Sequence, residues 1–498
     1  MNKKEALKIY HEHIEKIKAY DLVLATADFD SSTIAPKKGN AYRNKMMSIV
    51  QGEAFPIQTD PVLVEAIDYL NGIKLDEKMS REISLAKKNL EEILRFTKEE
   101  VMEYALVQMN ANDAWLEAKQ KKDYSIFEPH LLKLIELTKQ RTLKKKPDAN
   151  VYDTLLDDYE EGMNMKKYDA FFKLIRKELV PLIKKVSKKQ DFIDDSFICK
   201  YYPVEKQERF SKDLKKYLGF DPSWGYMGVS EHPFTNAFSR NDVRITTSYE
   251  EHNVISSIYS IIHETGHAFY EHQLDPAYDR LIELSGMSSG MHESQSRFLE
   301  NYLGKRESFF TKLYPKLQKL FPENLKDVSL EDFSKAANVS KCSLIRTDAD
   351  ELTYPIHILI RYEIEKMIFN DEIDLHDLPK IWNQKYKDYL GLDVPDDASG
   401  ILQDIHWSLA YFGYFPTYAL GSAIGAQIFH QMSKDMDVDE SLSKGDFKAL
   451  TDYLKDHIQK YGNLYDYDRI LQIATGEPFD PHYYTDYLKE KYQKLYEL

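Results

Sequence analysis

The chain has 498 residues, of which 43% are hydrophobic and 30% are charged, as is typical of a folded globular protein with a substantial core rather than of a disordered chain. Its 82 acidic residues outnumber the 67 basic ones and give a net charge of −15, which argues against nucleic acid or an anionic membrane as the main partner, because phosphate binding needs a basic surface. The two cysteines, Cys199 and Cys342, exclude a disulfide scaffold and a cysteine-built zinc site, so histidine and carboxylate groups are the available metal ligands.

Helical periodicity dominates the sequence. Residues 1–20 form a charged amphipathic pattern without the apolar centre of a signal peptide. Residues 114–145 and 168–189 place apolar residues at helical spacing against lysine-rich faces, which we interpret as solvated surface rather than binding patches. No uninterrupted apolar run reaches the roughly 20 residues that cross a bilayer. The sequence therefore predicts a cytoplasmic, mainly α-helical protein.

Strand-like sequence patterns are confined to two short segments, residues 225–235 and 242–249. Both alternate or cluster β-branched and aromatic residues. They predict a small β element directly before the segment "IIHETGHAFYEH" at residues 261–272.

That segment predicts a metal-binding helix. His263 and His267 are one helical turn apart, a spacing that lets two imidazoles share one ion. Glu264 is rotated by about 100° from His263, so its carboxylate can reach a metal-bound water without being a ligand. Gly266 weakens a helix by about 1 kcal/mol relative to alanine, which a close approach of another element would explain.

The pattern His-Glu-x-x-His also arises by chance in a few per cent of chains of this size, as a rough composition estimate, so its context matters. Tyr270 and Gln273 stand where the extended metzincin pattern needs glycine and histidine. A third ligand must therefore come from elsewhere, and residues 288–304, which read as a second helix, offer Glu293 or His292.

Six motifs in order resemble the carboxypeptidase Taq family of metallocarboxypeptidases over nearly the whole chain. They are "HPFT" (232–235), "DVRIT" (242–246), "HETGHAFYE" (263–271), "HESQSRFLEN" (292–301), "IRTDADELTYPIHI" (345–358) and "GILQDIHWSLAYFGYFPTYALG" (400–421). The resemblance implies a large, mainly α, two-lobed helical metallopeptidase with a deep central groove and a small β element near the zinc helix. It also implies a homodimer that holds one Zn²⁺, or Co²⁺, per subunit. Residues 1–498 would form a single peptidase unit, with 1–200 as a helical wall or lid and 201–498 as the catalytic half.

The resemblance also assigns roles to residues. It implies His263, His267 and Glu293 as metal ligands and Glu264 as general base, with His406, Tyr418 and His232 as donors to the tetrahedral oxyanion. Arg346 and Arg244 compete to bind the substrate's C-terminal carboxylate. We favour Arg346, and expect Arg244 to pair with Asp242 and to organise the wall of the cleft. The side chains expected to orient these histidines and arginines are Asp348, Asp350, Glu351, Gln403 and Asp404.

The leading hypothesis is a metallocarboxypeptidase that releases single C-terminal amino acids from peptides. A dipeptidyl carboxypeptidase or an oligoendopeptidase of related helical type is the nearest alternative, and product analysis separates them. A catalytically silent peptide-binding protein is disfavoured, because the metal ligands, the base and the carboxylate-binding candidates are all present. A purely structural helical scaffold gives no reason for six motifs in order.

Overall fold

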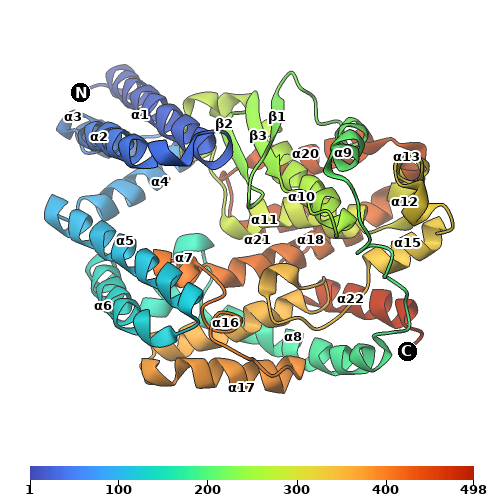
Figure 1. The fold of residues 1–498 in the computed structure, drawn as a ribbon. Helices are drawn as coiled ribbons and strands as arrows, with labels where there is room; N and C mark the ends of the chain where they lie inside the picture. Colours follow the sequence, from blue (N-terminus) through green and yellow to red (C-terminus); the bar gives the residue numbers. More distant parts are fainter.

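The computed structural model describes residues 1–498, except for the side chains of Ala41 and Lys98, and it consists mainly of helices (Figure 1). The helices before the sheet are α1 (Lys3–Thr33), α2 (Asn40–Gln58), α3 (Pro61–Asn71), α4 (Glu77–Ile93), α5 (Lys98–Lys121), α6 (Glu128–Lys145), α7 (Val151–Tyr159), α8 (Met165–Val186) and α9 (Val204–Leu218). The mainly α-helical fold predicted from the sequence is confirmed.

The second half begins with α10 (Val254–His272) and α11 (Ser289–Arg297), which continues as a π-helix, η5 (Phe298–Gly304). The helices that follow are α12 (Glu307–Phe310), α13 (Tyr314–Leu320), α14 (Pro322–Leu325), α15 (Leu330–Ala337), α16 (Tyr354–Phe369), α17 (Leu378–Leu390), α18 (Phe415–Asp435), α19 (Val438–Lys444), α20 (Phe447–His457), α21 (Tyr467–Thr475) and α22 (His482–Leu495). Short 3-10 turns connect many helices: η1 (Lys37–Gly39), η2 (Tyr124–Ile126), η3 (Ser187–Lys189), η4 (Pro276–Arg280), η6 (Arg346–Asp348), η7 (Leu375–Asp377), η8 (His406–Leu409) and η9 (Gln459–Tyr461).

One helical stretch predicted from periodicity is divided in the structure. Residues 114–145 form the end of α5, then η2, then α6. The break lies at Lys122, whose backbone adopts a left-handed conformation with φ 59°. Because this conformation cannot continue a right-handed helix, α6 starts in a new direction although the apolar spacing runs on.

A three-stranded sheet precedes α10, as predicted. It consists of β1 (Gly225–Val229), β2 (Thr235–Ser239) and β3 (Asp242–Thr247), in the spatial order β1-β3-β2. β1 runs parallel to β3, and β2 runs antiparallel to it, with Thr235 opposite Ile245. The buried side chains of Val243 and Ile245 pack against Ala268 of α10, so the sheet is fixed to the helix that carries the two histidines.

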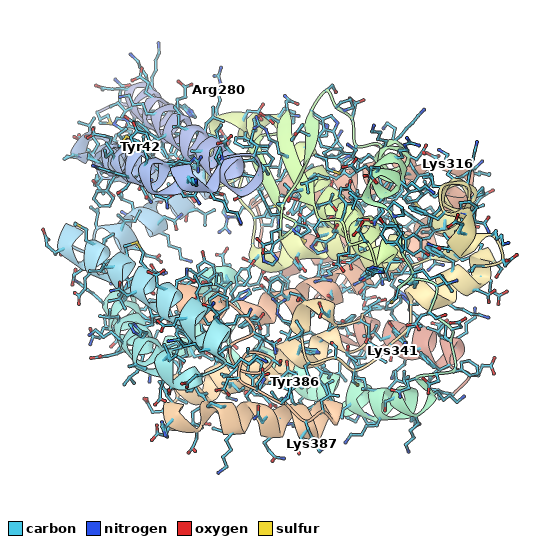
Figure 2. The ribbon with its side chains drawn as sticks, in the orientation of Figure 1. Tyr42, Arg280, Lys316, Lys341, Tyr386 and Lys387 are labelled. Carbon is cyan, nitrogen blue, oxygen red and sulfur yellow. The ribbon has the colours of Figure 1, made fainter. Side chains whose placement is uncertain are left out.

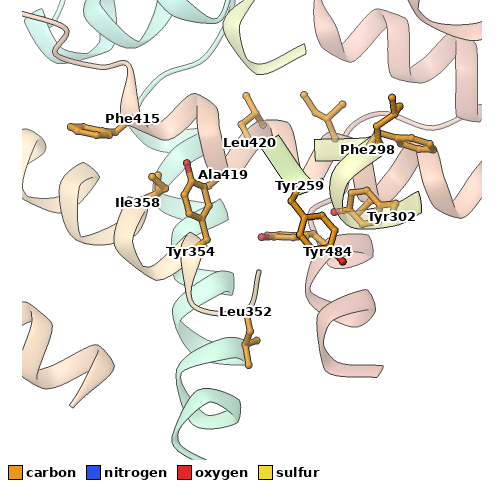
Figure 3. Close-up of a cluster of buried hydrophobic side chains, with 14 of the residues drawn as sticks. Tyr259, Phe298, Tyr302, Leu352, Tyr354, Ile358, Phe415, Ala419, Leu420 and Tyr484 are labelled. Atoms are coloured by element: carbon orange, nitrogen blue, oxygen red, sulfur yellow. The ribbon is translucent and has the colours of Figure 1, made fainter. Parts of the chain in front are cut away.

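Two hydrophobic clusters hold the helices together. The larger one extends from Leu85 of α4 to α22, and Figure 3 shows part of it around Tyr354, Phe415 and Leu420. A separate cluster joins α1, α3 and α4. Glu82 of α4, fully buried, ties this N-terminal group to the rest: it accepts hydrogen bonds from the Tyr10 hydroxyl at 2.6 Å and from the backbone N–H of Leu284 at 2.9 Å.

The outer helix faces are polar. On α17, Tyr386 is buried whereas its neighbour Lys387 is exposed to solvent (Figure 2), as expected for an amphipathic surface helix. Among the described residues, no helix has the length and apolar composition required to traverse a bilayer.

Candidate functional site

The site is built where α11 crosses α10. Gly266 lies at the crossing: a Cβ atom there would be 2.5 Å from the carbonyl oxygen of Gln295 and 2.6 Å from Cα of Ser296. The close approach expected from a glycine in mid-helix is therefore present. The opposite stripe of α10, which includes Val254, Ile258 and Phe269, is buried in the core, and this packing orients the histidine face toward α11.

The crossing brings three candidate metal ligands together. One ligand atom each of His263, His267 and Glu293 lies within 4.8 Å of the others. Oε2 of Glu293 is 3.9 Å from Nε2 of His263 and 3.6 Å from Nε2 of His267. Ligand atoms about 2.1 Å from a tetrahedral ion are separated by about 3.4 Å, so the three side chains fit one divalent ion.

A second layer of charged groups orients these candidate ligands. Arg297 donates to Oε1 of Glu293 at 2.7 Å, which leaves Oε2 directed at the histidines. Glu300 of η5 accepts from Arg297 at 3.0 Å and from Nδ1 of His263 at 2.8 Å. That contact leaves Nε2 of His263 as the ligating nitrogen. Burial disfavours a charged Glu300, but Arg297 and His263 outweigh it and lower the pKa of Glu300 to about 2.

Glu264 lies beside this group and next to the edge strand β2. Its carboxylate accepts a hydrogen bond from the hydroxyl of Thr235, which also reaches the Glu264 carbonyl oxygen at 3.2 Å. Burial raises the pKa of Glu264 above its usual range, although the neighbouring His263 opposes this. A carboxyl group with a raised pKa in this position suits proton transfer.

Tyr418 of α18 and His406 of η8 lie together beside the candidate ligands. A Cβ atom on Gly421 would be only 2.8 Å from Cβ of Glu293, so glycine allows α18 to pass directly over α11. One turn earlier, the hydroxyl of Tyr418 lies 3.2 Å from Nε2 of His406. Burial lowers the pKa of His406 to about 3, so this imidazole is neutral at physiological pH.

Arg346 lies next to Tyr418, with its guanidinium carbon 5.2 Å from the Tyr418 ring centre. It is buried and ion-paired to Asp404 at 2.9 Å. Its Nη1 donates to the hydroxyl of Tyr354 at 3.2 Å, and the Tyr354 ring is stacked by Arg297 at 4.5 Å. A continuous chain of contacts therefore links Arg346 to the candidate ligand Glu293.

Other predicted residues lie outside this group. His232 is exposed in the loop between β1 and β2. Arg244 pairs with Asp242 as expected, through Nε–Oδ1 and Nη2–Oδ2 contacts of 2.9 and 2.8 Å. His292, the alternative third ligand, bonds Glu271 at 3.0 Å through Nε2, and its ring stacks on that of His267.

The side chains expected to orient the site differ in what they contact. Gln403 accepts from the backbone N–H of Arg346 at 2.9 Å, so Gln403 and Asp404 both hold this arginine. Asp350 instead accepts backbone N–H groups of its own loop, and Glu351 pairs with Lys491. Asp348 is exposed, and partial desolvation together with the nearby Glu250 raises the pKa of its carboxyl group.

Sequence reasoning missed five residues of this arrangement: Thr235, Arg297, Glu300, Tyr354 and Arg361, the last of which is ion-paired with Asp404. Arg297 and Glu300 follow Glu293 by four and seven positions, and this helical spacing was the available signal. Arg361 lies one turn after His357 on a helix that reads as apolar, where a charged residue is rare unless it is paired. Thr235 carried no signal of its own.

Comparison with known proteins agrees with this geometry. The family model described as "Carboxypeptidase Taq (M32) metallopeptidase" matches residues 9–492. The chain belongs to this family. Carboxypeptidase 1 of Bacillus subtilis (strain 168) is 41% identical over 492 residues, covering 98% of each chain. The crystal structure of the M32 carboxypeptidase of Deinococcus radiodurans R1 is 28% identical with a TM-score of 0.96 and covers 99% of this chain and 100% of that one. Metallocarboxypeptidase 1 of Trypanosoma cruzi is 31% identical with a TM-score of 0.93 over 99% and 100%.

Membership of the carboxypeptidase Taq family establishes the general activity. The protein is a metallocarboxypeptidase, a peptide hydrolase that depends on a divalent metal ion. The predicted family and enzyme class are thereby confirmed. A dipeptidyl carboxypeptidase, an oligoendopeptidase and a silent binding protein are not favoured.

Proposed function

We propose that the enzyme removes single C-terminal residues from peptides, one at a time and with broad specificity, at the site formed by α10, α11 and α18. The observation that carries this proposal is the chain of contacts from Glu293 through Arg297 and Tyr354 to Arg346. It ties a three-ligand metal group to a buried guanidinium at a fixed distance. An exopeptidase needs this combination, because it must hold the terminal carboxylate while the adjacent bond is cleaved.

We infer that His263, His267 and Glu293 hold the metal, and that the metal is Zn²⁺, with Co²⁺ able to replace it. Two neutral imidazoles and one carboxylate are a common zinc set and leave one coordination position open, although the same set accepts other divalent ions. A divalent ion held there would polarise the scissile carbonyl and acidify a water molecule. Arg297 and Glu300 would keep the three side chains in place before the ion arrives.

Separate protein groups transfer the proton and stabilise the negative charge that develops on the substrate. Glu264 takes the proton of the attacking water and passes it to the leaving amine. Tyr418 donates its hydroxyl proton in a hydrogen bond to the developing oxyanion. Neutral His406 orients that hydroxyl by donating its single N–H from Nε2 to the Tyr418 oxygen at 3.2 Å. His232, exposed in the loop that leads to Thr235, would contact the substrate from that edge of the sheet.

Substrate recognition rests on Arg346, whose planar guanidinium suits a carboxylate. Its pairing with Asp404 is shared, because Asp404 also binds Arg361. Because the two guanidinium groups of Arg346 and Arg361 share the single carboxylate of Asp404, one positive charge remains in excess to bind the C-terminal carboxylate of the peptide. Arg244, already satisfied by Asp242, would shape the wall of the groove.

We further propose a single peptidase unit of two helical lobes, in which residues 1–200 form a wall or lid and residues 201–498 the catalytic half, as a homodimer in the cytoplasm. The separate core of α1, α3 and α4 supports a wall or lid formed by these helices, whereas α5 to α8 share the larger core with the catalytic half. Light scattering of purified protein tests the dimer, and a mass near 58.4 kDa, that of one chain, would contradict it.

Mass spectrometry of an N-blocked peptide of eight to ten residues tests the function. We expect a ladder of single-residue losses from the C-terminus that a chelator abolishes and Zn²⁺ or Co²⁺ restores. Dipeptide steps or internal cuts would retain the metal site but contradict the role of Arg346. No cleavage with any metal would refute the proposal.

A further inference from the structure

A second pocket lies in the N-terminal half, away from the three candidate metal ligands. Its volume is about 430 Å³, and its walls come from α2, α4, α5, α6 and α7 and from the segment 410–412. Five of its lining residues are aromatic: Phe55, Phe96, Tyr104, Tyr159 and Phe412. A pocket of this size and lining fits a small molecule with an apolar body.

Arg141 of α6 presents a guanidinium group to the pocket without a protein partner. The group is sandwiched between the rings of Phe96 and Tyr104, with its central carbon 4.2 Å from each ring centre. Its buried Nη1 has no hydrogen-bond partner, and no carboxylate whose side chain the structure describes lies within 4.0 Å of the group. The two rings fix the plane of the Arg141 guanidinium group and leave its N–H edge available to bind a carboxylate in bidentate fashion.

The side chain of Arg141 is half-buried, and its Nη1 atom is inaccessible to solvent. Partial desolvation lowers the pKa of Arg141 below its usual range, although Tyr104 and Glu100 oppose this. Glu100 is itself held by Lys144. A buried N–H group without a partner is unfavourable, so a bound anion would stabilise this edge of Arg141.

An excess of negative charge lies in the same pocket, one helical turn further along α6 than Arg141. Lys145 forms ion pairs with Glu92 at 2.7 Å and with Asp158 at 2.6 Å. Two carboxylates therefore share one ammonium group, and one negative charge is left in excess. A ligand with a carboxylate and an ammonium group close together would complement both Arg141 and this cluster.

We propose that this pocket binds a small zwitterion with an apolar body, the chemistry of a free hydrophobic amino acid, at a site separate from the metal centre. Arg141 binds its carboxylate, the Glu92–Lys145–Asp158 cluster binds its ammonium group, and the aromatic wall covers its side chain. The residues of the pocket by themselves support this binding site. Only the choice of L-phenylalanine as the probe rests on the proposed function, because that function releases free amino acids.

One wall of this pocket lies next to the candidate active site. Tyr159 packs edge-on against Tyr414 with ring centres 5.1 Å apart, and Tyr414 packs in the same way against Tyr418 at 5.2 Å. Hydrolysis must therefore be measured together with binding, so that a separate site is distinguished from an extension of the peptide groove.

The test is calorimetric titration of the metal-loaded enzyme with L-phenylalanine. The comparison ligands are 3-phenylpropanoate, which lacks the ammonium group, and phenethylamine, which lacks the carboxylate. The variants are Arg141→Met, with Arg141→Gln as a second form if the first does not fold, and Arg346→Met, which removes the carboxylate-binding guanidinium proposed at the metal site. Lys133→Met is the matched control, because Lys133 is an exposed cation on the same helix, paired only to Glu136 at 3.6 Å.

We expect both Arg141 variants to bind L-phenylalanine at least tenfold more weakly at this site. Lys133→Met and Arg346→Met should bind it at this site with the affinity of the wild type. Both comparison ligands should also bind at least tenfold more weakly, and peptide hydrolysis by Arg141→Met should be unchanged.

Equal binding by wild type and Arg141→Met would overturn the proposal, as would equal binding of 3-phenylpropanoate and L-phenylalanine. Binding lost only in Arg346→Met would place the amino acid in the catalytic cleft and overturn this site while leaving the proposed function intact. A raised KM for peptides in Arg141→Met without loss of L-phenylalanine binding would make the pocket a peptide subsite, which also overturns it.

Discussion

Arg346 and Asp404 form a buried ion pair in which Nε and Nη2 of the arginine both lie 2.9 Å from Oδ1 of the carboxylate. The second oxygen, Oδ2, is taken by Arg361 at 2.7 Å from Nε. Burial disfavours a charged Asp404, yet the two guanidinium groups hold its pKa well below the usual range. The carboxylate thus positions Arg346 without neutralising the cluster.

Replacing Asp404 by asparagine tests this arrangement. Asp404→Asn leaves two buried guanidinium groups without a counter-ion, a change that costs about 3–5 kcal/mol in comparable buried pairs. We expect a lower free energy of unfolding and a higher KM for N-blocked dipeptides. Denaturant unfolding and steady-state kinetics measure both. Asp396→Asn is the control, because its partner Lys122 is exposed and such surface pairs contribute about 1 kcal/mol or less.

Glu264→Gln tests the general base. The amide cannot take the proton of the attacking water, so kcat should fall by several orders of magnitude while the bound metal is retained. Turnover and metal content per chain measure the two effects. Glu271→Gln, on the same helix but paired with His292, should keep most of the activity. A Glu264→Gln variant near wild-type kcat would show that the base is assigned wrongly.

Arg297 and Glu300 should determine how tightly the metal is held. Arg297→Met frees Oε1 of Glu293, and Glu300→Gln removes the charge from the carboxylate that orients His263. Losses of this kind weaken metal binding by about 10–100-fold. Competition with a chromophoric chelator measures the affinity directly. Arg306→Met is a matched control, since Arg306 pairs with Asp439 at the surface, and an equal loss there would contradict a specific effect.

Gly266→Ala should damage both stability and activity. The added Cβ would be 2.5 Å from a backbone carbonyl oxygen of the crossing helix α11, so α10 and α11 must separate and carry Glu293 away from the histidines. Thermal unfolding and metal affinity should both fall. Gly52→Ala provides the contrast. Gly52 lies inside α2 with no atom within 4 Å of the new Cβ, so the substitution should raise stability by up to about 1 kcal/mol.

Glu160 predicts a pH dependence of stability. This carboxyl is fully buried and accepts the backbone N–H of Gly290 at 2.8 Å, and burial raises its pKa to about 8. Between its unfolded value of about 4.3 and about 8, the folded state binds more protons than the unfolded state. Its contribution to the free energy of unfolding is therefore fully present at low pH and falls as the pH rises through this window.

Urea unfolding at several pH values measures this contribution. The difference in stability between wild type and Glu160→Gln should change by several kcal/mol from pH 5 to pH 9, as a shift of this size implies at about 1.4 kcal/mol per pH unit. Wild type should lose stability relative to the variant as the pH rises. A constant difference would show that Glu160 titrates near its unfolded pKa.

Local features of the site could be predicted from the sequence because they depend on short-range geometry. The one-turn spacing of His263 and His267, the rotated position of Glu264 and the close approach at Gly266 all follow from helical periodicity. The two strand-like stretches, residues 225–235 and 242–249, likewise contain β1 and β3, whereas β2 (Thr235–Ser239) lies almost entirely between them and was not predicted. Helical periodicity failed at Lys122, which leaves the helical conformation without a change in the apolar pattern.

Contacts between distant segments had to come from the tertiary structure. Whether Glu293 or His292 lies with the histidines depends on the register at which α11 crosses α10, and adjacent residues on a helix point about 100° apart. The partner shared by Arg346 and Arg361 lies 58 and 43 positions away in the sequence, and the free edge of Arg141 exists because its neighbours pair elsewhere. The sequence by itself determined which chemical groups are available and how they are spaced along each helix. Only packing decided which of them meet, because helix crossings and loop paths are set by the complementarity of whole surfaces rather than by local spacing.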